Sequence, residues 1–264
     1  MTRLLNLFLS LTLLSSCANS QTKNAETKVV TIEYSNEING FSVKAIWKPN
    51  TVRYSHTKGP AIIEFYNKKD STTFTLTNNN FGILNSKLPF SYSEDSLEII
   101  SLNQNDIKLV YDENNLKSEY SFGTTNEPFF FQDLDFDNIK ELIIGEIGNG
   151  QREVASFKAY KFEYNDIQSE LYGITNIEPF KSLDEMSKVD NINKRIIIYG
   201  SGGICSSGSE IYKLQPSKND YEGNMFILET VIVEERDDNL NKCYELKYKV
   251  INQSKQLISK KEIK

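Results

Sequence analysis

Short hydrophobic runs separated by polar turns dominate the 264-residue chain. From residue 28 onward the runs are rich in β-branched and aromatic residues, and Asn, Asp, Gly, Ser and Lys separate them. Apolar and polar positions alternate with period two in TTFTLT (72–77) and YELKYKVI (244–251), as in a strand with one buried face. Several other runs are apolar throughout, which indicates central strands.

Helical periodicity is confined to one stretch, NIEPFKSLDEMSKV (176–189), which could hold one short helix. Many short strands with turn residues between them predict an all-β fold. We expect antiparallel sheets that form a sandwich or a small propeller-like domain with few short helices. Residues 28–264 are enough for one large β domain, and two halves that meet near residue 126 are the alternative.

The N-terminus has the pattern of an export signal. Arg3 precedes an apolar run over residues 4–14, which is too short to span a bilayer as a helix. The following Leu-Ser-Ser-Cys, ending at Cys17, resembles the lipobox of bacterial lipoproteins, in which the signal is cleaved before the cysteine and the cysteine is acylated. The alternative is an ordinary signal peptide with an incidental cysteine.

We therefore expect a signal peptide over residues 1–16, a lipidated tether over 17–27, and attachment to a membrane through lipid. Ala18 stands where an aspartate would favour the inner membrane. By the same resemblance, we expect a periplasmic protein anchored by lipid to the outer membrane.

The mature chain is acidic. Loss of Arg3 leaves 29 basic residues against 36 acidic ones, a net charge of −7. This charge argues against a nucleic-acid partner and favours a basic protein partner.

Two cysteines remain after Cys17, namely Cys205 and Cys243. In an oxidising compartment such a pair is expected to form a disulfide. The alternative, a free nucleophilic thiol, would need a base, and the single histidine of the chain, His56, lies far upstream.

Three aspartates stand two apart in FQDLDFDNIKELII (131–144), between two strand-like runs. Carboxylates at positions 1, 3 and 5 of a loop, here Asp133, Asp135 and Asp137, can surround one hard cation while the intervening apolar residues turn away. Asn138 falls where a sharp turn needs positive φ. The pattern continues with the Ile139 carbonyl at position 7 and Glu141 at position 9.

This pattern, DxDxDNxxEL, resembles the nine-residue calcium loops of integrin-type FG-GAP repeats. A solvated acidic turn is the alternative, but carboxylates packed closely repel one another unless a cation relieves them. We predict a structural Ca²⁺. Zinc is not expected, because no cysteine or histidine cluster accompanies the acids.

A Ser-Gly-rich stretch surrounds Cys205 in YGSGGICSSGSEIYKL (199–214). Pinned by a disulfide, it would form a rigid recognition loop, since preorganisation lowers the ordering cost of binding. A hydrolase nucleophile is the sharper alternative, but the stretch contains no G-x-S-x-G elbow. The single Trp47 and the many Tyr and Phe residues are expected in the core, and a glycan-binding aromatic platform is the alternative.

By order and spacing, the lipobox cysteine, the FSVKAIW run, the aspartate loop, the glycine-serine loop before EIYKL and the closing VIVEE run together resemble one family. It is the immunity lipoproteins of antibacterial type IV secretion systems, which inhibit lysozyme-like peptidoglycan hydrolases in the periplasm. The resemblance implies an all-β fold, a structural calcium site and a protruding loop that plugs a hydrolase cleft.

Small periplasmic lysozyme inhibitors use a Ser-Gly-x-x-Tyr motif for that plug. The corresponding residues here are Ser207, Gly208 and Tyr212, with one residue too many between them. The resulting hypothesis is a lipid-anchored periplasmic binding protein, not an enzyme, that inhibits a lysozyme-like hydrolase. A periplasmic or cell-surface glycan-binding module is the alternative. A hydrolase with paired carboxylates is a third possibility, although nothing in the sequence singles out such a pair.

Overall fold

The computed structural model describes residues 29–52, 56–84, 106–112, 119–122, 127–147, 155–164, 169–174, 177–203, 205–215 and 226–263. The predicted export signal, Cys17 and the tether lie outside these residues. Within the described ranges, no helix has the length and hydrophobicity needed to cross a bilayer.

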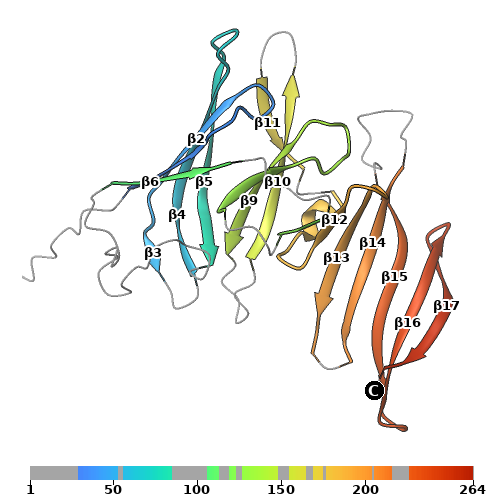
Figure 1. Ribbon diagram of the computed structural model, residues 1–264. Helices are drawn as coiled ribbons and strands as arrows, with labels where there is room; N and C mark the ends of the chain where they lie inside the picture. The colour runs from blue at the N-terminus through green and yellow to red at the C-terminus, as the bar shows by residue number, and fades with distance from the viewer. Residues whose placement is uncertain are drawn as a thin grey trace, which may run out of the picture.

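The first of two sheets has ten strands and curls around its own core (Figure 1). Its strands are β1 (Val29–Tyr34), β2 (Ser42–Trp47), β3 (Thr51–Val52), β4 (His56–Tyr66), β5 (Thr73–Leu84), β6 (Asp106–Tyr111), β8 (Phe129–Gln132), β9 (Glu141–Ile147), β10 (Ala155–Tyr164) and β11 (Ser169–Gly173). The order is β11-β10-β9-β5-β4-β2-β1-β6, with β3 beside β4 and β8 beside β9. Only the β1–β6 pair is parallel among these described strands.

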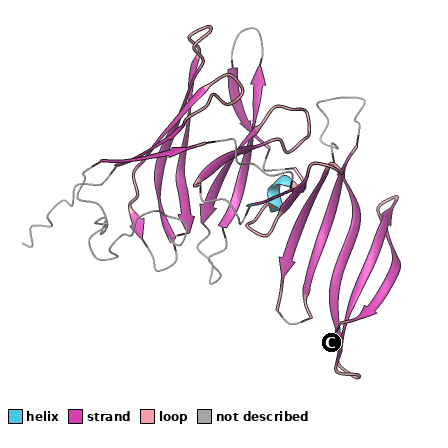
Figure 2. Ribbon diagram, in the orientation of Figure 1, coloured by secondary structure: helices cyan, strands magenta, loops and turns pink. Residues whose placement is uncertain are grey.

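The second sheet has seven antiparallel strands in the order β17-β16-β15-β14-β13-β12-β7. They are β7 (Glu119–Ser121), β12 (Lys188–Asp190), β13 (Arg195–Ser201), β14 (Ser207–Leu214), β15 (Phe226–Asp237), β16 (Lys242–Ile251) and β17 (Ser254–Glu262). Figure 2 shows that nearly all regular structure is strand. The all-β prediction is confirmed.

Strands β8 and β9 are buried on both faces, because each face of this part of the first sheet packs in a different core. Phe129 and Phe131 point into the first core, inside the curled sheet. Phe130, which lies between them, packs in the second core with Ile143 and with side chains of the second sheet such as Ile196. Because successive side chains of a strand point to opposite faces, neighbouring phenylalanines pack in separate cores. This arrangement explains why residues 129–131 and 142–144 are apolar without a break.

The stretch expected to hold a short helix contains one helical turn, the 3₁₀ helix η4 (Phe180–Ser182). Beyond it, the Asp184 carboxylate accepts hydrogen bonds from the N–H groups of Met186 and Ser187, each at 2.9 Å. This side-chain turn replaces a second helical turn and leads into β12.

The chain does not complete one sheet before starting the other. Residue 126, near which two halves were expected to meet, lies outside the described residues. Before it, β7 belongs to the second sheet, whereas β8 to β11 after it belong to the first.

Candidate metal centre

The three aspartates occupy the connection from β8 to β9, as the sequence predicts. Alternate residues of the loop point in opposite directions. Leu134 is fully buried in the second core, and Phe136 packs against the same core, with its ring 6.1 Å from that of Phe226 on β15. The expectation that the intervening apolar residues turn away from the carboxylates is therefore confirmed. Their burial ties the acidic loop to the contact between the two sheets.

Two residues with positive φ give the loop its sharp turn. Asn138 has φ 71°, as its position in the pattern predicts, and Phe136 has φ 63°. Positive φ is unusual for a phenylalanine because its Cβ crowds the backbone. The Phe136 ring packs against the second core, and this contact offsets the backbone cost of the positive φ. The sequence pattern did not predict the positive φ of Phe136.

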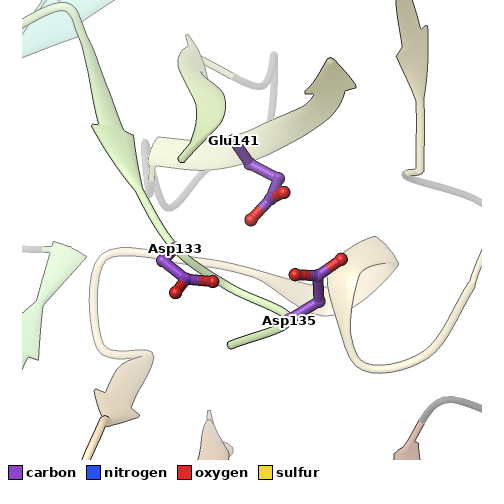
Figure 3. A group of neighbouring side chains, drawn as sticks. All are labelled: Asp133, Asp135 and Glu141. Carbon is purple, nitrogen blue, oxygen red and sulfur yellow. The ribbon is translucent and has the colours of Figure 1, made fainter. Parts of the chain in front are cut away.

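Asp133, Asp135 and Glu141 bring their carboxylates together. Figure 3 shows Glu141 at the start of β9 pointing toward the two aspartates. One oxygen from each of the three residues lies within 4.8 Å of the others. The donor set consists of oxygen atoms alone, which suits a hard cation such as Ca²⁺.

Asp133 also holds the backbone of the loop. Its carboxylate accepts hydrogen bonds from the N–H groups of Asp137 at 3.2 Å and Asn138 at 2.9 Å. Asp137 also accepts a backbone hydrogen bond, from the N–H of Ile139 to its Oδ1 at 2.7 Å. The loop therefore has internal hydrogen bonds that need no ligand.

Glu141 is the most deeply buried member of the group, with no exposed surface. Its Oε2 accepts a hydrogen bond from the N–H of Leu134 at 2.7 Å, whereas its Oε1 has no hydrogen-bond partner among the described residues. Burial raises the pKa of Glu141 well above its ordinary value of 4.5, and the nearby Asp135 charge adds to that rise. A buried carboxylate oxygen without a partner costs folding free energy, so a ligand bound to this atom would stabilise the protein.

Lys161 on β10 is the functional residue that the sequence pattern missed. Its ammonium contacts the carboxylate of Asp135 and lies 2.9 Å from Oδ2 of Asp137. Although burial opposes its charge, hydrogen bonds to these two aspartates raise the pKa of Lys161 above its ordinary value of 10.5. Tyr160 pairs with Leu142 in the β9–β10 ladder, so the next residue, Lys161, lies beside Glu141.

The charges of the site remain unbalanced even with this lysine. The three loop aspartates and Glu141 carry four formal negative charges when ionised, and Lys161 neutralises one of them. Burial raises the pKa of both Asp133 and Asp135 above 3.8. The residues fit a divalent cation. Asp133, Asp135 and Glu141 form the close group, whereas the Asp137 carboxylate bonds Lys161 and the backbone of Ile139.

The predicted disulfide between Cys205 and Cys243 is confirmed, with 5.6 Å between their Cα atoms. Gly208 pairs with Val233 on β15, and Arg236 pairs with Cys243, so the continued register places Cys205 beside Arg236. The disulfide therefore passes over β15 and joins the β13–β14 turn to β16. The free-thiol alternative is wrong, because the sulfur of Cys205 is bonded.

The structure does not bring the three predicted partner-binding residues together. Ser207 begins β14 and pairs with Ser201, beside the turn. Gly208 lies within the sheet, where a Cβ would come within 2.7 Å of the Ile232 carbonyl oxygen. Tyr212 is buried in the second core, and its hydroxyl donates to Glu210 at 2.7 Å. The exposed residues at this end of the hairpin instead lie between Ser201 and Ser207.

Trp47 is fully buried in the first core, where its ring packs edge-on against Phe81. The core placement expected for this residue is confirmed, and Trp47 cannot form part of an exposed glycan platform.

No family model matches the chain, and no curated protein matches it in sequence. The chain is similar to a solved structure of a Xanthomonas type IV secretion system related protein, with a TM-score of 0.49 and 11% sequence identity. The similarity covers 92% of this chain and 97% of that chain.

Proposed function

We propose that the protein is a lipid-anchored periplasmic binding protein, not an enzyme, that inhibits a lysozyme-like peptidoglycan hydrolase. The observation that carries the proposal is the disulfide-tied turn between β13 and β14, at the end of the second sheet far from the first sheet (Figure 1). A turn held rigid by a disulfide can enter an enzyme cleft at low entropic cost.

The turn is ordered by its own backbone. The N–H of Gly202 donates to the Ser206 carbonyl at 3.0 Å, and the N–H of Ser206 donates to the Gly203 carbonyl at 3.3 Å. Cys205 has φ 58° and is buried, whereas Gly202, Gly203 and Ser206 are exposed. These three exposed residues, together with Ser201, are the ones we assign to partner contact.

Charge supports the same class of partner. The mature chain, with 29 basic and 36 acidic residues, has a net charge of −7, whereas lysozymes are typically basic. Opposite net charge speeds encounter and disfavours like-charged competitors.

The proposed calcium has a structural role in this protein. Asp133, Asp135 and Glu141 would hold it, with Asp137 and the Ile139 carbonyl as the further ligands of the sequence pattern. The ion would supply positive charge at a loop whose Leu134 and Phe136 side chains pack at the second core. Calcium should therefore raise the melting temperature of the protein, and EDTA should lower it. If EDTA leaves the melting temperature unchanged, the loop is only an acidic turn and the structural calcium is refuted.

An inhibition assay tests the proposed function. Calcium-loaded mature protein is added to a panel of lysozymes and toxin-type peptidoglycan hydrolases, and lysis of cell-wall suspensions is followed. The Ser206→Arg variant should lose inhibition of the sensitive hydrolase, because it places bulk and positive charge at the exposed turn. The control Ser71→Arg makes the same change at the exposed β4–β5 turn and should inhibit normally. Absence of inhibition across the panel would refute the proposal.

A glycan-binding module remains the second candidate, and one observation favours it. Tyr244 and Tyr248 are two alternations apart on β16, so they share one face of the sheet with the exposed Leu257 of β17. The ammonium of Lys260 lies 4.1 Å from the centre of the Tyr244 ring. Sedimentation with insoluble peptidoglycan, lost in Tyr248→Ala and retained in Ser206→Arg, would select this candidate over the inhibitor.

A further inference from the structure

We propose that Lys161 is an internal cation that competes with the divalent ion for the aspartate loop, so that the loop exchanges between a lysine-neutralised and a metal-neutralised state. The inference rests on the proposed calcium site and adds its regulation. It concerns β10, a strand that contributes none of the predicted ligands.

The competition centres on Asp135. This residue belongs to the close carboxylate group with Asp133 and Glu141, and the Lys161 ammonium contacts the same carboxylate. Both side chains of the ion pair are largely buried, with exposures of 19% for Lys161 and 1% for Asp135. Two positive charges held at one buried carboxylate repel each other strongly, because water screens little there. Metal binding must therefore weaken the Lys161 contact.

The lysine alone does not complete the site. The fully buried Glu141 side chain points toward the two aspartates (Figure 3), and its Oε1 has no hydrogen-bond partner in the described part of the chain. The ammonium reaches Asp135 and Asp137 but leaves this oxygen unsatisfied. This unsatisfied atom is the second observation, beyond the acidic cluster itself, that indicates a ligand.

The lysine is nevertheless sufficient to keep the loop folded without metal. It bridges Asp135 and Asp137, while backbone N–H groups of the loop donate to Asp133. The metal-free protein therefore keeps its loop, and calcium affinity is reduced by the work of displacing an ammonium. We expect an affinity in the weak range of extracellular calcium modules, about 10⁻⁴ to 10⁻³ M, rather than that of a cytosolic buffer.

Titration calorimetry with CaCl₂ and thermal melts with and without EDTA test the inference on the mature protein. In Lys161→Met, which keeps the apolar stem and removes the charge, calcium should bind at least about tenfold more tightly. EDTA should lower the melting temperature of this variant by more than it lowers that of the wild type. The matched control is Lys158→Met on the same strand, which removes the ion pair with Glu146 outside the loop and should leave calcium affinity unchanged.

Equal or weaker calcium binding by Lys161→Met would overturn the inference, as would an EDTA effect no larger than that of the wild type. If Lys161→Met folds only with calcium, the lysine is shown to replace the ion. If it does not fold in either buffer, Lys161→Gln, which keeps a hydrogen-bond donor without the charge, decides by the same two measurements. Inhibition of a hydrolase is not a readout here, so failure of the inhibitor proposal leaves this result independent.

Discussion

The two-faced strand β8 makes a quantitative prediction about how the protein unfolds. Phe130 has 1% exposure and packs in the second core, whereas the single tryptophan, Trp47, is buried in the first. Truncation of a buried phenylalanine to alanine costs about 3 to 5 kcal/mol of unfolding free energy, through lost transfer and the remaining cavity. For a chain of this size a loss of about 4 kcal/mol lowers the melting temperature by roughly 8 to 16 °C.

Phe130→Ala should show this loss in Trp47 fluorescence, although the two residues lie in different cores. The physical reason is that β8 and β9 form a wall of both cores, so neither core can open without exposing the other. Urea unfolding followed by Trp47 emission and by far-UV circular dichroism measures it. Ile192→Ala, at a residue with 76% exposure, is the control and should change the unfolding free energy little. A Trp47 transition unmoved by Phe130→Ala, with a shifted dichroism transition, would refute the reasoning and establish two independent units.

Three further predictions use other parts of the fold. Replacing both Cys205 and Cys243 by alanine opens a link between residues 38 apart in sequence, and should cost about 4 kcal/mol in non-reducing melts by the chain-entropy estimate. Burial raises the pKa of Glu127 above 4.5 while the Tyr34 hydroxyl donates to it, so its protonated form is favoured in the folded state. Glu127→Gln should therefore stabilise the protein at pH 7, by an amount that shrinks as the pH falls toward 4.5 and below, in urea unfolding measured against pH. Gly59→Ala would place a Cβ 2.2 Å from a backbone carbonyl oxygen, and a loss of more than about 2 kcal/mol in thermal melts is expected.

The local parts of the site were predictable from the sequence because they depend on spacing within one loop. Asp133 and Asp135 converge because alternate residues share a side, and Asn138 takes the positive φ that its place in the turn requires. The disulfide was predictable because two cysteines follow the predicted export signal. Lys161 could not be found in this way. It reaches the loop through the register of β9 and β10, which depends on pairing across a connection rather than on any pattern in β10 itself.

The placement of Tyr212 shows the limit of motif matching in strands. One extra residue turns a side chain to the other face of a sheet, and β14 also has a register shift between Ile211 and Tyr212. The extra residue of this shift, Glu229, lies on β15, whereas β14 pairs with β13 in unbroken register, with Tyr212 opposite Ile196. Tyr212 therefore shares with Ile196 the face that meets the second core. Its burial against the second core follows from that face.

The position of β7 has a consequence for how the protein can be divided. This strand, at residues 119–121, pairs with β12 at residues 188–190. The chain between them forms the four strands β8 to β11, which belong to the first sheet. A single cut anywhere in that interval separates β7 from its partner strand or divides the first sheet. The two sheets are therefore not exchangeable modules: neither can be inherited or expressed intact as one continuous piece of the gene without strands of the other.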